Sequence, residues 1–358
     1  MENLESKQRN KSSIHSDVYE RKKIIILMVL FSVLIISMLI ALTIGVYQIS
    51  IIDVFSTIMY HIIPVDDMSN FNSLYDTIVW NIRFPRIILS VGVGISLAAA
   101  GGIYQGCFRN PLVEPYILGV ESGAAFGAAM AIVIPSFFLS LQVSAFLFGG
   151  IAVFSAYLLA RVRGETPVIM LILSGVIIGS IFTAFVSILK YVASDAALRE
   201  IVFWLMGGFY YASWSDVFLV IPIILISFFL VWLLSWKLNI LSMGDEEAKT
   251  LGVNPEWYKA FFIIFATLMT ALSVSVVGVI AWVGLMMPHA ARMIIGPDHR
   301  FMLPTAAMMG GIYLILCDTI ARTLTSAEIP VGILTSIIGA PYLLYLIRNK
   351  GKLTFGVD

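Results

Sequence analysis

Long apolar runs separated by short polar segments dominate the chain. A run of about 20 apolar residues can cross a bilayer as a helix, because a helix satisfies its backbone hydrogen bonds within the segment. Ten such runs occur along the 358 residues. They cover residues 24–46, 87–108, 116–134, 137–160, 168–189, 217–236, 258–277, 279–295, 301–321 and 331–347. The pattern therefore predicts an all-α integral membrane protein with about ten transmembrane helices.

The polar segments predict the domain organisation and the orientation. We expect a polar tail at residues 1–23, one ten-helix membrane domain at 24–348, and a second tail at 349–358. An even number of spans puts both termini on one side, and the basic cluster Arg21-Lys22-Lys23 beside the first run places that side in the cytoplasm. Of the 22 Lys and Arg residues, 17 are then cytoplasmic and five face outward. We expect a multi-pass protein of the plasma or inner membrane with both termini and both tails cytoplasmic.

Composition narrows the class of protein further. Hydrophobic residues make up 59% of the chain, charged residues only 12%, and the mean hydropathy is +0.96, which excludes an ordinary soluble domain. The formal net charge of +0 offers no basic surface for nucleic acid. The sequence contains no H-E-x-x-H, no G-x-S-x-G and no G-x-x-x-x-G-K-[ST] motif. We therefore expect no catalytic residues, and any ATP hydrolysis must come from another chain.

Arginines at the outer ends of the predicted helices are exceptions to the excess of Lys and Arg on the cytoplasmic side. Arg83 and Arg86 flank a proline, and Arg322 ends a later span. Such arginines could present guanidinium groups outward to carboxylates of a partner, or they could simply reach the lipid interface. Asp318 lies four residues before Arg322, so the two could form an ion pair within the helix.

The sequence of the main inner loop, residues 237–257, predicts a short helix within it. Gly244 breaks the preceding segment, Asp245 could cap a new helix, and residues 246–251 provide about one and a half turns before Gly252 ends it. This helix could dock a cytoplasmic protein, or it could be an ordinary capped loop helix.

A lone histidine, His289, lies near an inner helix end with Arg292 three residues later. It could be a metal or haem ligand, but an interfacial histidine is the interpretation we favour. We therefore expect no metal site.

Short motifs occur in a fixed order within residues 83–347. They are R-F-P-R at 83–86, N-P-L-V-E-P at 110–115, L-G-V-E-S-G-A at 118–124, G-L-M-M-P-H at 284–289, D-H-R at 298–300, D-T-I-A-R at 318–322 and E-I-P-V-G at 328–332. With these motifs the chain resembles the FecCD/BtuC-like permease family, the membrane subunits of importers for iron siderophores, haem and vitamin B12.

The resemblance implies a type II ATP-binding-cassette (ABC) importer and its partners. These are a second copy of the permease (a homodimer, or a related heterodimer), two ATPase subunits and an extracytoplasmic substrate-binding protein. It implies that this chain binds no cofactor itself and that the partner ATPase uses ATP and Mg.

The resemblance also implies two docking sites. By position, Arg83, Arg86 and Arg322 would receive acidic residues of the binding protein. The loop that couples to the ATPase would contain Leu241, Gly244, Asp245, Ala248, Leu251 and Gly252.

The sequence leaves the cargo and the substrate pathway open. We prefer an iron chelate, a ferric siderophore; cobalamin, haem or an oxyanion such as molybdate are alternatives within the family. A secondary transporter driven by an ion gradient is an alternative of another class. Such a transporter normally has ionisable residues deep inside its spans, and the spans here have almost none.

Overall fold

The computed structural model describes residues 2–62, 73–134, 136–325 and 327–355, and within them it contains helices and no named strand. The elements are α1 (Glu2–Thr43), α2 (Ile51–Ile62), α3 (Ser73–Asp76), the π-helix η1 (Thr77–Arg83), α4 (Phe84–Cys107), α5 (Val120–Val133), α6 (Leu141–Ala160), α7 (Val168–Val192), α8 (Asp195–Met206), α9 (Trp214–Leu233), α10 (Ser235–Leu241), α11 (Asp245–Thr250), α12 (Pro255–Val277), α13 (Val283–Ile295), α14 (His299–Leu324) and α15 (Val331–Phe355).

Each of the ten predicted spans coincides with a helix. In the described part of the chain seven helical segments are long and apolar enough to cross a membrane, and α5, α13 and the first part of α15 are shorter apolar helices. The all-α membrane fold is therefore confirmed. Five helical elements were not predicted: α2 and α8, which are amphipathic, the short α3 and α10, and the π-helix η1.

The span predicted at 116–134 begins later than expected. Its helix, α5, starts at Val120, because the preceding residue, Gly119, has a left-handed φ of 83° that does not fit a right-handed helix. The stretch before α5 is held by side chains instead, and the Tyr116 hydroxyl donates a hydrogen bond to the Ile280 carbonyl at 2.8 Å.

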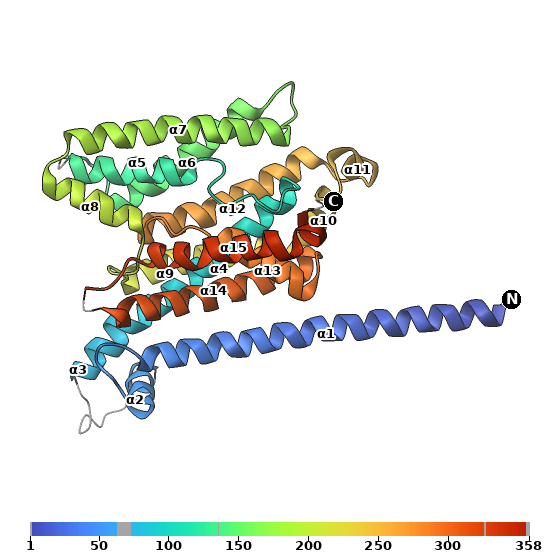
Figure 1. Ribbon diagram of the computed structural model, residues 1–358, viewed down its shortest axis with the longest axis horizontal. Coiled ribbons are helices and arrows are strands. Elements are labelled where there is room, and N and C mark those ends of the chain that lie inside the picture. The colour runs from blue at the N-terminus through green and yellow to red at the C-terminus, as the bar shows by residue number, and fades with distance from the viewer. Residues whose placement is uncertain (1, 63–72, 135, 326, 356–358) are drawn as a thin grey trace.

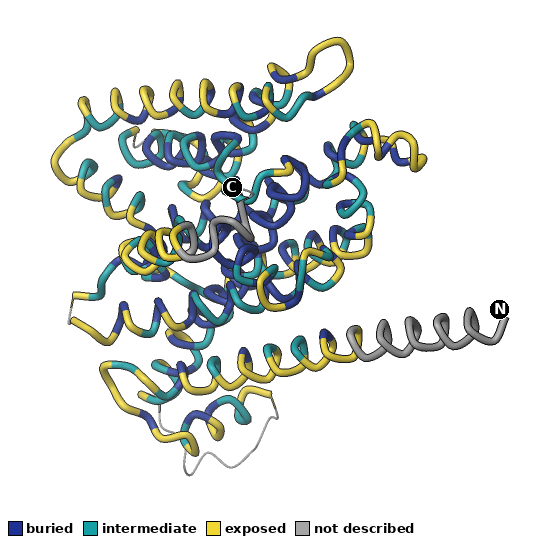
Figure 2. Tube along the Cα trace, turned by 45° about the vertical axis from the view of Figure 1, so that its right-hand side comes forward, coloured by how far each residue is buried: buried dark blue, intermediate teal, exposed yellow. Residues whose placement is uncertain are grey.

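The centre of the molecule is α4, in which 21 of 24 residues are buried. It packs against α9, α12, α13 and α14, while α5, α6 and α7 form a second group that joins the first through α12 (Figure 1). Exposed residues lie along α1 and α7 at the periphery, and buried residues fill the middle (Figure 2). Most of the exposed side chains on these two helices are large and apolar, as a lipid-facing surface requires.

The two ends of the helix bundle carry different elements. The start of α1, the end of α15 and the short helices α10 and α11 lie at one end (Figure 1). The opposite end carries α2, α3 and α8 (Figure 1). We call these the α11 end and the α3 end.

Close backbone approach between α4 and α14 depends on glycine. A Cβ atom added at Gly94 would collide with the Gly310 carbonyl oxygen, and one at Gly310 would collide with that of Gly94. Small residues let helices pack this closely in lipid, where packing replaces the hydrophobic effect as the driving force.

We expect Gly94→Leu to separate α4 from α14 and to destabilise the protein by about 3 kcal/mol, as overpacking of a dense core does. The measurement is the thermal melting of the purified protein in detergent. Gly150→Leu on α6 is the matched control, because a Cβ there meets nothing within 4 Å. Equal melting temperatures for the two variants would contradict the packing described here.

Candidate functional site

The three arginines expected at the outer surface lie together at the α3 end, but their side chains are buried. The exposed fractions are 5% for Arg83, 7% for Arg86 and 6% for Arg322. Arg83 ends η1, and η1 continues directly into α4, so Arg83 and Arg86 belong to one continuous helical segment. In this structure the guanidinium groups do not point outward as free forks.

Arg83 and Arg322 bind the end of α1. Arg83 Nη1 donates hydrogen bonds to the carbonyl oxygens of Leu42 (2.7 Å) and Thr43 (3.1 Å), and Nη2 donates to that of Tyr47. Arg322 Nη2 donates to the Ala41 carbonyl. The last carbonyls of a helix have no partner within the helix, so the two arginines cap α1.

Arg86 has two carboxylate partners. Its Nε and Nη2 donate to Asp318 Oδ1 at 3.0 and 2.8 Å, and its Nη1 donates to Glu328 Oε2 at 2.9 Å. Asp318 is only 1% exposed, whereas the Glu328 side chain is 38% exposed. Arg86 is therefore neutralised by two carboxylates, the buried one of Asp318 and that of Glu328, which reaches the surface.

This network extends one expectation. The predicted pair of Asp318 with Arg322 is present at 4.0 Å, but Arg86, at 2.8 Å, is the closer partner of Asp318. Sequence reasoning missed this partner because 232 residues separate the two. It also missed Glu328, although the E-I-P-V-G motif that contains this residue was recognised.

The short helix at the α11 end forms almost where predicted. It covers Asp245–Thr250, and its N-cap residue is Gly244 rather than Asp245. Gly244 and Gly252 bracket it with φ values of 146° and 73°, which only glycine adopts without strain.

Asp245 binds a neighbouring helix instead of capping its own. Its Oδ2 lies 3.1 Å from Nζ of Lys259 on α12, a lysine that is only 1% exposed. Lys259 also contacts Glu256 Oε1 at 2.8 Å and donates to the Thr166 carbonyl at 3.0 Å. These contacts fix α11 to α12 and to the α6–α7 connection.

Lys249, on α11 itself, pairs with one glutamate of α11 and with one of the α6–α7 connection. Lys249 Nζ lies 3.0 Å from Glu246 Oε1 and 3.1 Å from Glu165 Oε1. Hydrogen bonds to Glu246 and Glu165 raise the pKa of Lys249, so this lysine stays charged at physiological pH.

The six residues expected in the coupling loop divide into buried and exposed ones. Leu241 and Ala248 are buried, at 1% and 0%, and hold the loop against the bundle. Leu251 is 57% exposed, and Met243 and Trp257 near it are 62% and 56% exposed. All three are exposed apolar side chains in or beside the loop at the α11 end, and of the three only Leu251 was singled out from sequence.

His289 lies in the middle of α13 and is only 2% exposed, so it is inside the bundle rather than at an interfacial helix end. Among the described residues no group of three or more His, Cys, Asp or Glu is arranged to hold a metal ion.

The bundle and its two polar ends define a multi-pass membrane protein with its candidate sites at opposite ends of the helices. Residues 33–349 match the model of the FecCD transport family. The chain belongs to this family and is a permease subunit of an ABC importer, not an enzyme itself.

Relatives and a solved structure support this assignment. The chain is 43% identical to the cobalamin import system permease protein of Halobacterium salinarum, over 76% of this chain and 74% of that protein. It is 40% identical to the molybdate import system permease protein of Haemophilus influenzae, over 76% and 82%. A metal-chelate type ABC transporter solved in an inward-facing conformation matches with a TM-score of 0.80 and 36% identity, over 90% of this chain and 98% of that one.

Proposed function

We propose that this chain forms the membrane pathway through which an iron chelate, a ferric siderophore, enters the cytoplasm. The observation that carries the proposal is the 36% identity, over 90% of this chain, to a transporter described as of metal-chelate type. The chain itself binds no cofactor in this proposal. Its partners are a second copy of the permease, or a related subunit, two ATPase subunits that use ATP and Mg, and an extracytoplasmic binding protein.

In the proposed orientation the α11 end lies in the cytoplasm, together with both termini. Two observations support this orientation. The first is the positive-inside bias, with 17 of 22 Lys and Arg residues on that side. The second is the position of the start of α1 and the end of α15 at the same end as α11 (Figure 1).

The ATPase docks at α11 in this proposal. A rigid element transmits movement better than a loose loop, and Lys259 fixes α11 to α12 through Asp245. The exposed apolar side chains of Met243, Leu251 and Trp257 would be covered by the ATPase. Leu241 and Ala248 hold the loop against the bundle, and Gly244 and Gly252 provide the positive φ values at the two ends of α11.

The binding protein docks at the α3 end, over Arg83, Arg86 and Arg322. Glu328 is the accessible edge of the arginine network, since its side chain is 38% exposed and it pairs with Arg86. An acidic residue of the binding protein could replace Glu328 as a partner of Arg86. This exchange would let docking act on α4 and α14, which carry Arg86 and Asp318.

Cobalamin is the second candidate cargo, because a relative that is 43% identical is named a cobalamin importer permease. The test is uptake into vesicles that contain the permease, its ATPase and its binding protein, with ferric siderophore, cobalamin and haem supplied in separate arms. We expect accumulation of the ferric siderophore alone. Accumulation of cobalamin or haem instead would overturn the iron-chelate proposal.

A further inference from the structure

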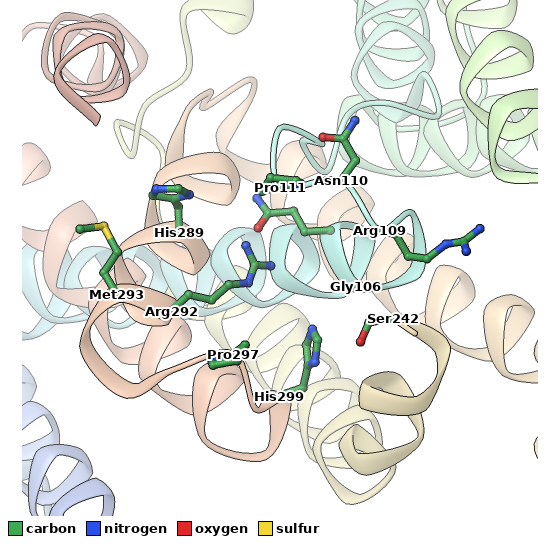
Figure 3. A pocket seen from close by; sticks show the side chains of 11 residues that line it. Gly106, Arg109, Asn110, Pro111, Ser242, His289, Arg292, Met293, Pro297 and His299 are labelled. Carbon is green, nitrogen blue, oxygen red and sulfur yellow. The ribbon is translucent and has the colours of Figure 1, made fainter. Parts of the chain in front are cut away.

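A cavity of about 550 Å³ lies outside the residues assigned to the two docking sites. Figure 3 shows the side chains that line it. It lies between the end of α4, the loop after α4, the end of α10, the end of α13 and the start of α14. Eleven described residues line it; they include two arginines and two histidines, and none is acidic. The cavity therefore presents positive charge without a carboxylate of its own.

Arg292 supplies the charge at the centre of this cavity. Its side chain and that of His299 point into the same space, whereas Arg109 extends away from it (Figure 3). Arg83 and Arg86 donate to acceptors in the same chain, whereas among the described residues no carboxylate pairs with Arg292. A half-buried guanidinium with free donors favours an anion that accepts two hydrogen bonds.

His299 supplies the opposite chemistry, a hydrogen-bond acceptor. Asn239 Nδ2 donates to Asp298 Oδ1 at 2.8 Å, so Asn239 Oδ1 is an acceptor. That oxygen receives both the backbone N–H and Nδ1 of His299, at 2.8 and 2.7 Å. His299 Nδ1 therefore carries the ring proton, and Nε2 of the neutral ring keeps its lone pair.

The network that orients His299 persists over the physiological pH range. Burial opposes ionisation of Asp298, but hydrogen bonds from Arg300 and Asn239 outweigh it and lower its pKa to about 2. Asp298 therefore remains an acceptor for Asn239, and Asn239 remains an acceptor for His299.

Two buried acceptors of this cavity have no protein partner. They are Nε2 of His299, a residue only 5% exposed, and Oε1 of Gln105, a residue only 3% exposed. The amide orientation of Gln105 is fixed because its Nε2 donates to backbone carbonyls such as that of Val113. Buried polar atoms are nearly always satisfied, so a ligand that brings a proton donor is expected here.

We propose that this cavity binds a protonated phosphate group. Its charged oxygens accept hydrogen bonds from Arg292, and its P–OH donates to His299 Nε2 or to Gln105 Oε1. Sulfate and molybdate are fully deprotonated at neutral pH and cannot satisfy these acceptors. Inorganic phosphate and the headgroup of a phosphomonoester lipid share the required chemistry, and both can reach the end of the bundle.

The test is equilibrium binding of radiolabelled orthophosphate to the full-length permease in phosphate-free detergent. We expect saturable binding that Arg292→Gln weakens by at least about tenfold, as loss of a charge-assisted hydrogen bond implies, and that Arg292→Lys partly restores. Arg161→Gln is the matched control, since Arg161 is an exposed arginine outside this cavity; it should bind as the unmodified chain does. No binding, or equal binding by the Arg292→Gln variant, would overturn the proposal.

Competition tests the acceptors separately from the charge. Sulfate should displace phosphate at least about tenfold less effectively than unlabelled phosphate does; equal displacement would refute the role of His299 and Gln105. Nanodiscs of phosphatidylcholine with or without phosphatidic acid then distinguish the two sources. If phosphatidic acid displaces the labelled phosphate, the occupant of the site is a lipid headgroup. If the phosphate is retained, the occupant is free phosphate.

Discussion

Replacing Arg86 by methionine is expected to destabilise the protein by about 3–5 kcal/mol, the usual cost of removing one member of a buried ion pair. The substitution leaves the Asp318 carboxylate, which is 1% exposed, without its main partner. It also frees Glu328, whose side chain is more accessible and costs less to leave unpaired. Thermal melting of the purified permease in detergent measures the effect.

The double variant Arg86→Met with Asp318→Leu should recover much of this loss, because well-packed apolar residues can replace a buried ion pair at little cost. Arg300→Met is the matched control: Arg300 pairs with Asp298 at 2.7 Å, but its side chain is 55% exposed, so its loss should cost less than about 1 kcal/mol. An Arg86→Met protein that melts normally and only loses affinity for the binding protein would show that Arg86 faces the partner instead of Asp318.

Replacing Leu251 by aspartate should weaken assembly with the ATPase while the fold stays intact. Leu251 is 57% exposed at the end of α11, so a carboxylate there is solvated in the free permease. Covered by a partner, the same carboxylate would be desolvated, and we expect affinity for the ATPase to fall by at least about tenfold. Co-purification with the ATPase and thermal melting of the permease alone measure the two effects.

Val162→Asp is the matched control for this prediction. Val162 is 44% exposed in the connection between α6 and α7, outside α11 and the exposed apolar side chains beside it. It should retain the ATPase. Retention of the ATPase by the Leu251→Asp variant would contradict the docking role of α11.

The membrane-crossing helices were predictable because lipid imposes a length and a polarity on them. The apolar runs identified all ten, and the glycine at 244 identified the start of α11. The same rule failed at the start of α4, where Arg83 and Arg86 ended the apolar run although the helical segment continues through them. Charges are tolerated there because their partners are the end of α1, Asp318 and Glu328, which are distant in sequence.

The polar sites were predicted less completely than the helices. The inner loop follows local rules of turn and helix formation, so its position emerged from residues 241–252 alone. By contrast, the cavity at Arg292 requires α4, α10, α13 and α14 to meet, and the sequence showed only separate parts of it, a histidine with a nearby arginine and the motif that begins at Asn110. The burial of the three outer arginines depends in the same way on contacts between distant segments.

The most direct test of the account is ATP-dependent uptake into proteoliposomes that contain the permease, its ATPase and its binding protein. The account predicts that cargo accumulates only when hydrolysable ATP is present on the side of α11, and that Leu251→Asp lowers accumulation. Accumulation that follows an ion gradient without ATP, or that needs ATP on the side of α3, would contradict it.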